Sequence, residues 1–417
     1  MDLLLLCLPL LLIIALLFMR QHMLVAGLAG GVLTMLIGGL SIGGATGIFL
    51  GGMKQMLSII VPILYAAAAA MVARAGSVQA IVELAQRYLK GRIAILAGVF
   101  VLIQAGATYM AGMGAGNTMV IAPLVAAAVG CIPGVVAGMA IATAACFTTS
   151  PASTETAIAA KAAATDLALH ASNMLPYTIL FVLGGAVLAA WSVWRKGAIV
   201  NTPDGVEAPE ASMSLGKLWI TALPALLLLF LVVGGNFLNA LIGVKLFTPM
   251  TIIIVTAGAV VACSKLSMTE TCEALTDGAR FILTTLFAVG IFLGMINLMA
   301  EIGTFKEIAG LASTVSPAFV LPVAILIGFG VAFPAGAFCA GVLTLILPTL
   351  SNLGMPSEAM GFVAIATGLG TQISPVQINV AALGQGFDLP IMGVVRANLP
   401  YVLSALAVLM VLAITVV

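Results

Sequence analysis

The chain has 417 residues, of which 63% are hydrophobic and only 7% are charged, and its formal net charge is +1. Soluble domains carry about 25% charged residues, so this composition excludes a soluble protein and predicts an all-α polytopic membrane protein. The near-zero net charge argues against a nucleic-acid partner. The six cysteines show no metal-ligand spacing, and no hydrolase, metalloprotease or Walker motif is present. We therefore expect no enzyme activity, no metal site and no cofactor beyond a coupling ion.

Apolar runs of about 18 or more residues are candidates for membrane spans, and such runs fill the chain from end to end. The predicted spans are 3–18, 23–42, 58–72, 93–110, 119–132, 134–165 and 173–194 in the first half, and 218–240, 248–263, 281–300, 318–333, 341–353, 357–386 and 391–417 in the second. Residues 77–92 place apolar and charged positions at helical spacing, which predicts an amphipathic helix at the membrane surface.

Two stretches of the chain nearly repeat each other. Residues 140–151 read AIATAACFTTSP and residues 364–375, which lie 224 positions later, read AIATGLGTQISP. The tripeptide LPY at 175–177 recurs at the same offset, at 399–401. A fixed offset indicates an internal duplication. We predict a first repeat at 1–194, a cytoplasmic linker at 195–217 and a second repeat at 218–417.

Each predicted repeat contains a re-entrant hairpin followed by a broken helix. The hairpins, 93–132 and 318–353, are rich in small residues at their tips and carry no charge there. The broken helices are 134–165 and 357–386; as one straight helix, the first would extend about 48 Å, against a hydrocarbon core of about 30 Å. We predict the breaks at Pro151 and Pro375, because proline removes a backbone donor and disrupts the preceding turn.

The distribution of basic residues predicts the topology. Re-entrant hairpins leave five crossings in each repeat, an odd number, so the two repeats would have inverted orientations with both termini in the periplasm. Lys and Arg concentrate in cytoplasmic loops. This topology places eleven of the 15 basic residues inside (Arg20, Arg74, Arg87, Lys90, Arg92, Arg195, Lys196, Lys217, Lys265, Arg280 and Arg396) and three outside (Lys54, Lys245 and Lys306), with Lys161 in a span. Hairpins that crossed once would instead give six crossings and parallel repeats.

Polar residues crowd the two breaks and the tip of the first hairpin. Paired interrupted helices indicate a transporter's binding site, because half-helix N-termini offer N–H groups to an anion and the freed carbonyls can hold Na⁺. The predicted substrate-binding residues are Gly116, Asn117, Thr118, Thr149, Ser150, Ser153, Thr154, Gln372, Ser374, Gln377 and Asn379. Candidates for the coupling ion are Gly114, Asn117, Ser150, Glu155, Thr371 and Ser374, with Glu155 the candidate for a proton. Simple proline kinks and small-residue packing are the structural alternatives.

The segment GAGNTMVIAPLVAAAV at 114–129, followed by TSPAST at 149–154, resembles the ion transporter superfamily. It looks most like the Dcu-type C4-dicarboxylate carriers, and it is also similar to divalent-anion/sodium symporters and to the membrane subunits of tripartite carboxylate transporters. On this resemblance, the motif residues of the family are assigned to Asn117, Thr118, Ser150 and Pro151. The second tip, which begins PAGA at 334, has no counterpart of the Ser-Asn-Thr tip of the divalent-anion symporters.

This resemblance implies an elevator-type secondary active transporter in the bacterial inner membrane. Its substrate would be a small organic carboxylate, most readily a C4-dicarboxylate, and Na⁺ or H⁺ would move with it. The alternatives are a Na⁺/H⁺ antiporter of the same superfamily, a citrate or gluconate carrier, and the membrane subunit of a tripartite importer. A tripartite importer would need a small membrane partner and a periplasmic one; otherwise the expected partners are the lipid bilayer and, in a homodimer, a second copy. A channel or a membrane enzyme is the alternative of a different class.

Overall fold

The computed structural model describes residues 3–19, 21–57, 60–89, 92–197, 213–336 and 339–417. Within these ranges the chain is helical and contains no β-strand. Most of the predicted linker, residues 198–212, lies outside the described residues, as does Ala337 at the second hairpin tip.

The helices of the first half are α1 (Leu3–Phe18), α2 (Met23–Gly38), α3 (Ile42–Leu57), α4 (Ile60–Arg74), α5 (Ser77–Leu89), α6 (Ile93–Ala111), α7 (Ala115–Val129), α8 (Pro133–Thr149), α9 (Thr154–Ala162) and α10 (Leu167–Lys196). Those of the second half are α11 (Leu215–Ile242), α12 (Pro249–Cys263), α13 (Met268–Glu301), α14 (Thr304–Gly310), the 3₁₀ helix η1 (Leu311–Ser313), α15 (Pro317–Ala332), α16 (Cys339–Asn352), α17 (Ser357–Thr371), α18 (Ile378–Phe387) and α19 (Ile391–Val416). The helix α3 was not among the predicted spans.

Five helical segments in the described part of the chain are long and apolar enough to cross a membrane. They lie in α6, α10, α11, α13 and α19, and the bent pair α8–α9 makes a sixth if it counts as one span. The other apolar helices, such as α1 and α2, are shorter than 18 residues. At 1.5 Å per residue, the 16 residues of α1 extend only about 24 Å. The crossings expected from these shorter helices are therefore not established by length.

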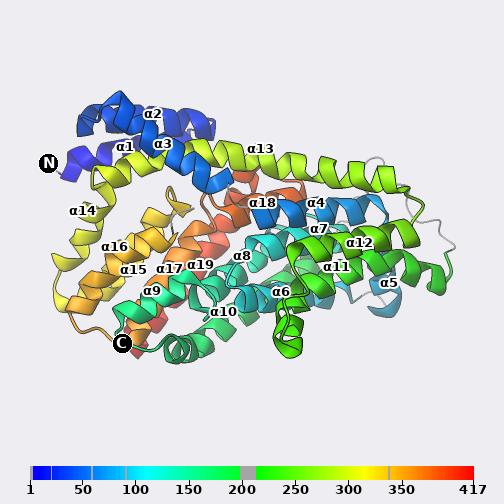
Figure 1. Cartoon of the computed structure of the whole chain (residues 1–417). Helices are drawn as coiled ribbons and strands as arrows, with labels where there is room; N and C mark the ends of the chain where they lie inside the picture. Colours follow the sequence, from blue (N-terminus) through cyan, green and yellow to red (C-terminus); the bar gives the residue numbers. More distant parts are fainter. Residues whose placement is uncertain (1–2, 20, 58–59, 90–91, 198–212, 337–338) are drawn as a thin grey trace.

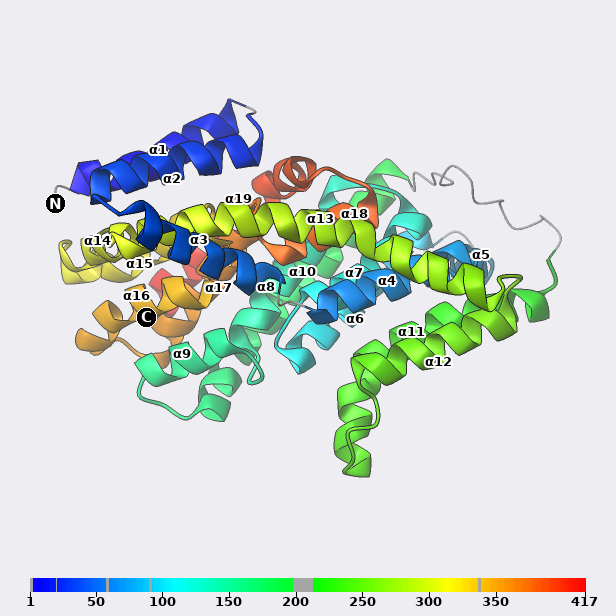
Figure 2. The ribbon, with the colours of Figure 1, turned by 45° about the horizontal axis from the view of Figure 1, so that its top comes forward.

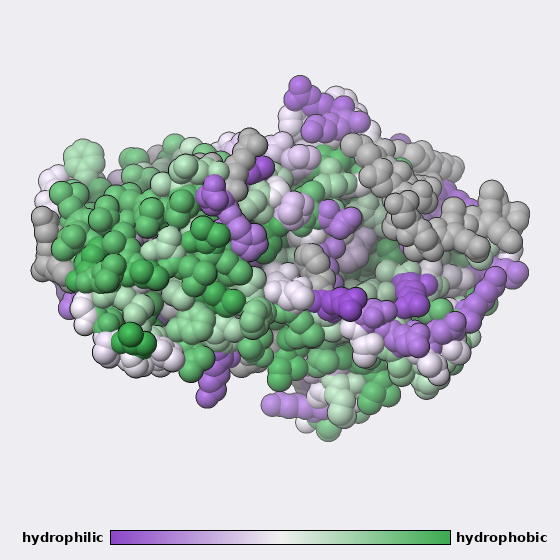
Figure 3. Space-filling view, turned by 90° about the horizontal axis from the view of Figure 1, so that it is seen from above, coloured by the Kyte–Doolittle hydropathy of each residue, from purple (hydrophilic) through white to green (hydrophobic). Residues whose placement is uncertain are grey.

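The surface is that of a multi-pass membrane protein. Large apolar side chains point outward on many helices: Ile42 is 79% exposed, Trp194 76% and Leu36 75%. Exposed apolar area on this scale is unfavourable in water and suits contact with lipid. Figure 3 shows hydrophobic side chains over the half of the molecule that holds α1 and α2, with hydrophilic ones gathered toward the other half.

The helices of the second half begin at positions that match those of the first. The starts of α6, α8, α9 and α10 recur 224 residues later as the starts of α15, α17, α18 and α19, and the described part of α16 begins 224 residues after the start of α7. The amphipathic helix α5 precedes α6 in the chain, and the helix α14, followed by the short η1, precedes α15 in the same way. One long helix, α13, stands where the first half has the pair α3 and α4. The recurrence therefore covers helix boundaries as well as short sequence motifs.

The contacts between the two halves follow the same correspondence. The helix α7 packs against α18, and its counterpart α16 packs against α9, the counterpart of α18. The helices α8 and α17 are counterparts of one another, and they pack together. Each half therefore supplies one helix to each of two equivalent pairs. The pair of α7 and α18 lies near the middle of the molecule, and the pair of α16 and α9 lies nearer the end that holds α14 and α15 (Figures 1 and 2).

Small residues allow the central helices to approach closely. Every residue of α8 after Pro133 is buried, and α8 packs against α10. A Cβ atom added to Gly185 would lie 2.5 Å from the carbonyl oxygen of Gly138, and one added to Gly138 would lie 2.4 Å from that of Gly185. Close backbone contact at glycine is a common way of packing helices in membranes.

We predict that Gly185→Ala destabilises the protein, because the added methyl group meets backbone that cannot move aside. Overpacking of this kind costs about 1–3 kcal/mol, so thermal unfolding in detergent should begin several degrees lower. The matched control is Gly184→Ala, since no atom lies within 4 Å of a Cβ there; it should leave the midpoint unchanged or raise it. Equal midpoints for the two variants would contradict this packing.

Candidate functional site

Both predicted broken helices are interrupted in the structure. The helix α8 ends at Thr149, α9 begins at Thr154, and the two axes differ by 52°; Pro151 lies in this break. In the second half, α17 ends at Thr371 and α18 begins at Ile378, with Pro375 between them. These interruptions leave short stretches of non-helical backbone in the middle of the protein.

The turn of each hairpin lies against the break of its own half. Gly112, which caps α6 with a φ of +69°, has no room for a side chain, because a Cβ atom would lie 2.4 Å from the carbonyl oxygen of Ala152. The hydroxyl of Ser150 donates a hydrogen bond to the carbonyl of Tyr109 at the same contact. In the second half, a Cβ atom on Gly336 would lie 2.4 Å from the Cβ of Ser374.

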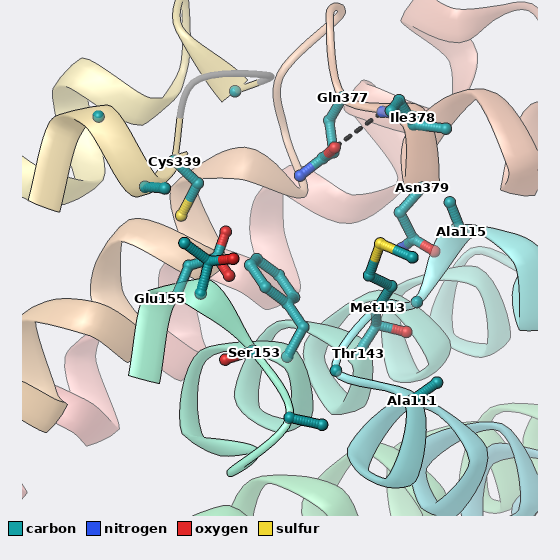
Figure 4. Close-up of a pocket in the computed structure, with 18 residues that line it drawn as sticks. Ala111, Met113, Ala115, Thr143, Ser153, Glu155, Cys339, Gln377, Ile378 and Asn379 are labelled. Carbon is teal, nitrogen blue, oxygen red and sulfur yellow. Dashed lines mark hydrogen bonds between the residues drawn. The ribbon is translucent and has the colours of Figure 1, made fainter. Parts of the chain in front are cut away.

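A cavity of about 500 Å³ lies between these elements. Its wall combines the first hairpin turn, both breaks and the beginning of α16, as Figure 4 shows. Small-molecule sites in proteins commonly have volumes of about 300–1,000 Å³. The cavity is thus large enough for a small organic molecule, and the two halves of the chain both contribute to it.

Several helix N-termini face this cavity. Ala115, Thr154 and Ile378, the first residues of α7, α9 and α18, all line it, and so does Cys339, the first described residue of α16. The first N–H groups of a helix lack partners within the helix, and its dipole places partial positive charge there. Side chains occupy some of these groups: Ser153 accepts from the Thr156 N–H at 3.1 Å, and Gln377 accepts from that of Ile378 at 2.8 Å. No side chain caps α7.

A neutral hydrogen-bond network lies beside the cavity and joins the two halves. The amide of Gln104 donates to the hydroxyls of Thr118 and Thr143 at 2.6 and 2.7 Å. Thr118 lies 2.6 Å from Oδ1 of Asn379, and Nδ2 of Asn379 donates to Oε1 of Gln372 at 2.6 Å. All five side chains are at least 95% buried. Such networks fix the relative positions of the helices that carry them.

Sequence reasoning missed Gln104, Thr143 and Asn398. Asn398, on α19, donates to the carbonyl of Gln372 at 2.8 Å and holds the second break in place. The available signal was a carboxamide inside an otherwise apolar span, since buried polar side chains in a membrane need partners. Gln104 also has an oxygen, Oε1, that is buried without a hydrogen-bond partner among the described residues.

The structure sorts the predicted site residues into three groups. Those that line the cavity are Gly114, Ser153, Thr154, Glu155, Gln377 and Asn379. Those in or beside the buried network are Asn117, Thr118, Thr371 and Gln372. The third group consists of Gly116, Thr149, Ser150 and Ser374, which are engaged in packing. Gly116 lies against Tyr65 and Ser374 against Gly336. Thr149 hydrogen-bonds to Thr178, and Ser150 to Tyr109.

Thr149 therefore does not reach the cavity, although sequence reasoning placed it among the substrate ligands. Its hydroxyl lies 2.7 Å from the Ala145 carbonyl and 2.7 Å from the hydroxyl of Thr178 on α10. The residue is in the last turn of α8, where its side chain folds back onto the preceding turn. It joins α8 to α10.

The chain matches no protein-family model, and a comparison with curated proteins finds no significant relative.

We predict that Gln104 and Thr118 are energetically coupled. Gln104→Leu and Thr118→Val should each destabilise the protein, because each leaves buried polar partners unsatisfied at a cost of about 1–3 kcal/mol. The double variant should lose less than the sum, by about 0.5–3 kcal/mol, as measured by unfolding in detergent. The control pairs Gln104→Leu with Thr34→Val, since the buried Thr34 hydroxyl bonds only within α2; those two effects should add. Additivity in both pairs would contradict a shared network.

Proposed function

We propose that this protein is a secondary active transporter of small organic carboxylate anions, C4-dicarboxylates foremost, coupled to Na⁺ or H⁺. The observation that carries the proposal is the convergence of helix N-termini from both halves on one cavity. Helix N-termini are ready anion sites, because their N–H groups and dipoles favour negative charge. No Lys or Arg is among the residues lining the cavity, so the backbone would supply the attraction.

The absence of Lys and Arg from the residues that line the cavity suits a carrier. A transported anion must be released as well as bound, and a fixed buried cation would hold it strongly. Each helix terminus contributes about 0.3–1 kcal/mol at exposed sites and up to about 2 kcal/mol in partly buried ones. Several termini acting together can bind an anion, and the bound anion can still dissociate.

We further propose that the two halves are inverted repeats. The counterpart helices α5 and α14 lie at opposite ends of α13 (Figure 1). Near the beginning of α13, Asp277 lies 3.4 Å from Arg74, which shortly precedes α5; α14 follows directly after its end. The 34 residues of α13 extend about 51 Å, which exceeds the thickness of the hydrocarbon core. Counterparts on opposite sides of a crossing helix are expected for inverted repeats.

We also propose that transport follows an elevator mechanism. In this proposal the hairpins and broken helices move together against a scaffold that includes α4 and α13. The surface between them contains a separate small hydrophobic cluster, to which α4 contributes Ala66, α13 contributes Ile282 and Leu286, and α7 and α18 contribute Met119 and two alanines. This surface is apolar, so no hydrogen bond or ion pair within the cluster would have to break during sliding.

The inverted arrangement predicts opposite accessibility for α5 and α14. In a variant without its native cysteines, Lys306→Cys should react with a membrane-impermeant maleimide added to intact cells. Arg87→Cys should react only after the membrane is opened, because α5 faces the cytoplasm in this topology. Labelling of both positions from the same side would mean that the repeats are parallel.

Transport can be tested in proteoliposomes. We expect uptake of succinate, driven by an imposed Na⁺ or proton gradient, to exceed that of citrate and gluconate. Asn379→Leu should reduce uptake at least about tenfold, the equivalent of about 1.4 kcal/mol, because it removes a polar group of the cavity wall and breaks the network behind it. Asn352→Leu, the same substitution at an exposed position, should retain uptake. No uptake of any of these anions by the unmodified protein would contradict the proposed function.

A further inference from the structure

The two halves place different residues at one equivalent position of the cavity. Glu155 and Asn379 are separated by the repeat offset of 224, and each is the second residue of a helix that follows a break, α9 or α18. Both line the same cavity. A position that the duplication made equivalent therefore holds an acid at one end of the cavity and an uncharged amide at the other.

The Asn379 end is built from neutral groups. The helices α7 and α18 pack together here, and Asn379 is tied at 2.6 Å to both Thr118 and Gln372. Figure 4 shows Asn379, Ala115 and Met113 on the same side of the cavity. No side chain described at this end can lose or gain a proton near neutral pH. The end therefore keeps the same charge whether or not a substrate is bound.

The Glu155 end is the counterpart pair, formed by α9 and α16. Glu155 is half-buried, and it lies beside Cys339 in Figure 4. Cys339 is the other titratable side chain among the residues that line the cavity. The remaining helices packed against α9, namely α8, α10 and α17, add no charged side chain to the wall.

No described cation neutralises Glu155. Lys161 is on the same helix but six residues further along, where it is exposed, and the ion pairs found in the described residues join Arg74 to Asp277 and Arg87 to Glu83. An ionised Glu155 would therefore face any bound anion directly. Like charges that share a site favour protonation of one of them.

We propose that the two ends divide the work of coupled transport: the neutral Asn379 end holds a carboxylate of the substrate, and Glu155 binds the proton that travels with it. This inference rests on the proposed transport function and specifies its coupling ion. When a dicarboxylate enters, the ionised Glu155 takes one proton from solution. The resulting carboxylic acid can donate a hydrogen bond to the second carboxylate. On release of the substrate, the proton leaves Glu155 on the side where the substrate leaves.

The sign of the pH dependence follows from this linkage. Above the pH at which Glu155 ionises in the free protein, substrate binding requires the uptake of a proton, so affinity falls as pH rises. One coupled proton changes the dissociation constant by up to about tenfold per pH unit. Without a titrating group at this position, affinity should be nearly independent of pH over the same range.

Binding of succinate to the purified full-length protein tests the inference. Isothermal titration calorimetry between pH 6 and 8.5, repeated in buffers of different ionisation enthalpy, gives both the affinity and the number of protons taken up. In the unmodified protein we expect uptake approaching one proton and weaker binding at high pH. In Glu155→Gln, succinate should still bind, its affinity should change less than twofold across the range, and no proton should be taken up.

Two further variants serve as controls for the effect of Glu155→Gln. Glu155→Asp keeps a carboxyl group and should retain proton uptake, whereas a merely structural role for Glu155 would not separate Asp from Gln in this way. Glu307→Gln removes an exposed carboxyl group on α14 and should behave like the unmodified protein. Size-exclusion profiles and thermal midpoints establish that each variant is folded. If Glu155→Gln does not fold, proton uptake by the unmodified protein and by Glu155→Asp decides the matter.

The outcomes separate this inference from the proposed function. Succinate binding without proton uptake, or binding that requires Na⁺ and does not depend on pH, would overturn the role of Glu155. Neither result would contradict the proposed anion site. Proton uptake that persists in Glu155→Gln would also overturn the role of Glu155 alone. Failure of the unmodified protein to bind succinate, citrate or gluconate would overturn the proposed function, and the role of Glu155 with it.

Discussion

The need to satisfy backbone polar groups away from water governs this structure. A helix that stops inside a membrane protein frees N–H and C=O groups, and such backbone is tolerated only where protein or a water-filled cavity covers it. Here α8 and α17 both stop in the middle of the molecule. The hairpin turns, with glycines at Gly112 and Gly336, pack directly onto the interruptions. Helix N-termini of α7, α9 and α18 are among the groups that line the cavity between these elements.

One cavity is built from parts of the chain that lie far apart in the sequence. The helix pairs α7 with α18 and α16 with α9 each join a helix that follows a hairpin turn in one half to the helix that follows the break in the other half. Positions separated by the offset of 224 residues carry different side chains at the cavity. Glu155 corresponds to Asn379, and Asn117 corresponds to Gly341 at the same offset. The two ends of the cavity thus carry unlike side chains.

The sequence predicted the two helix interruptions and the amphipathic helix, but it did not predict several of the side-chain contacts around them. Pro151 and Pro375 mark the two interruptions, since proline cannot continue a helix with normal hydrogen bonding, and the amphipathic pattern of 77–92 coincides with α5 over Ser77–Leu89. The repeat could not reveal Gln104 or Asn398, because their counterparts are Gly328 and Met174. Nor could spacing show that Thr149 turns toward Thr178. That contact depends on how α10 packs against α8, which no local pattern encodes.

We propose that the helix N-termini around this cavity bind a small carboxylate. A structure of the protein in lipid nanodiscs, determined by cryo-electron microscopy with saturating succinate, would show whether they do. We expect ligand density between Ala115, Thr154 and Ile378, with carboxylate oxygens at hydrogen-bond distance from backbone N–H groups of α7 and α9. Ligand density elsewhere, with this cavity holding only water, would contradict it.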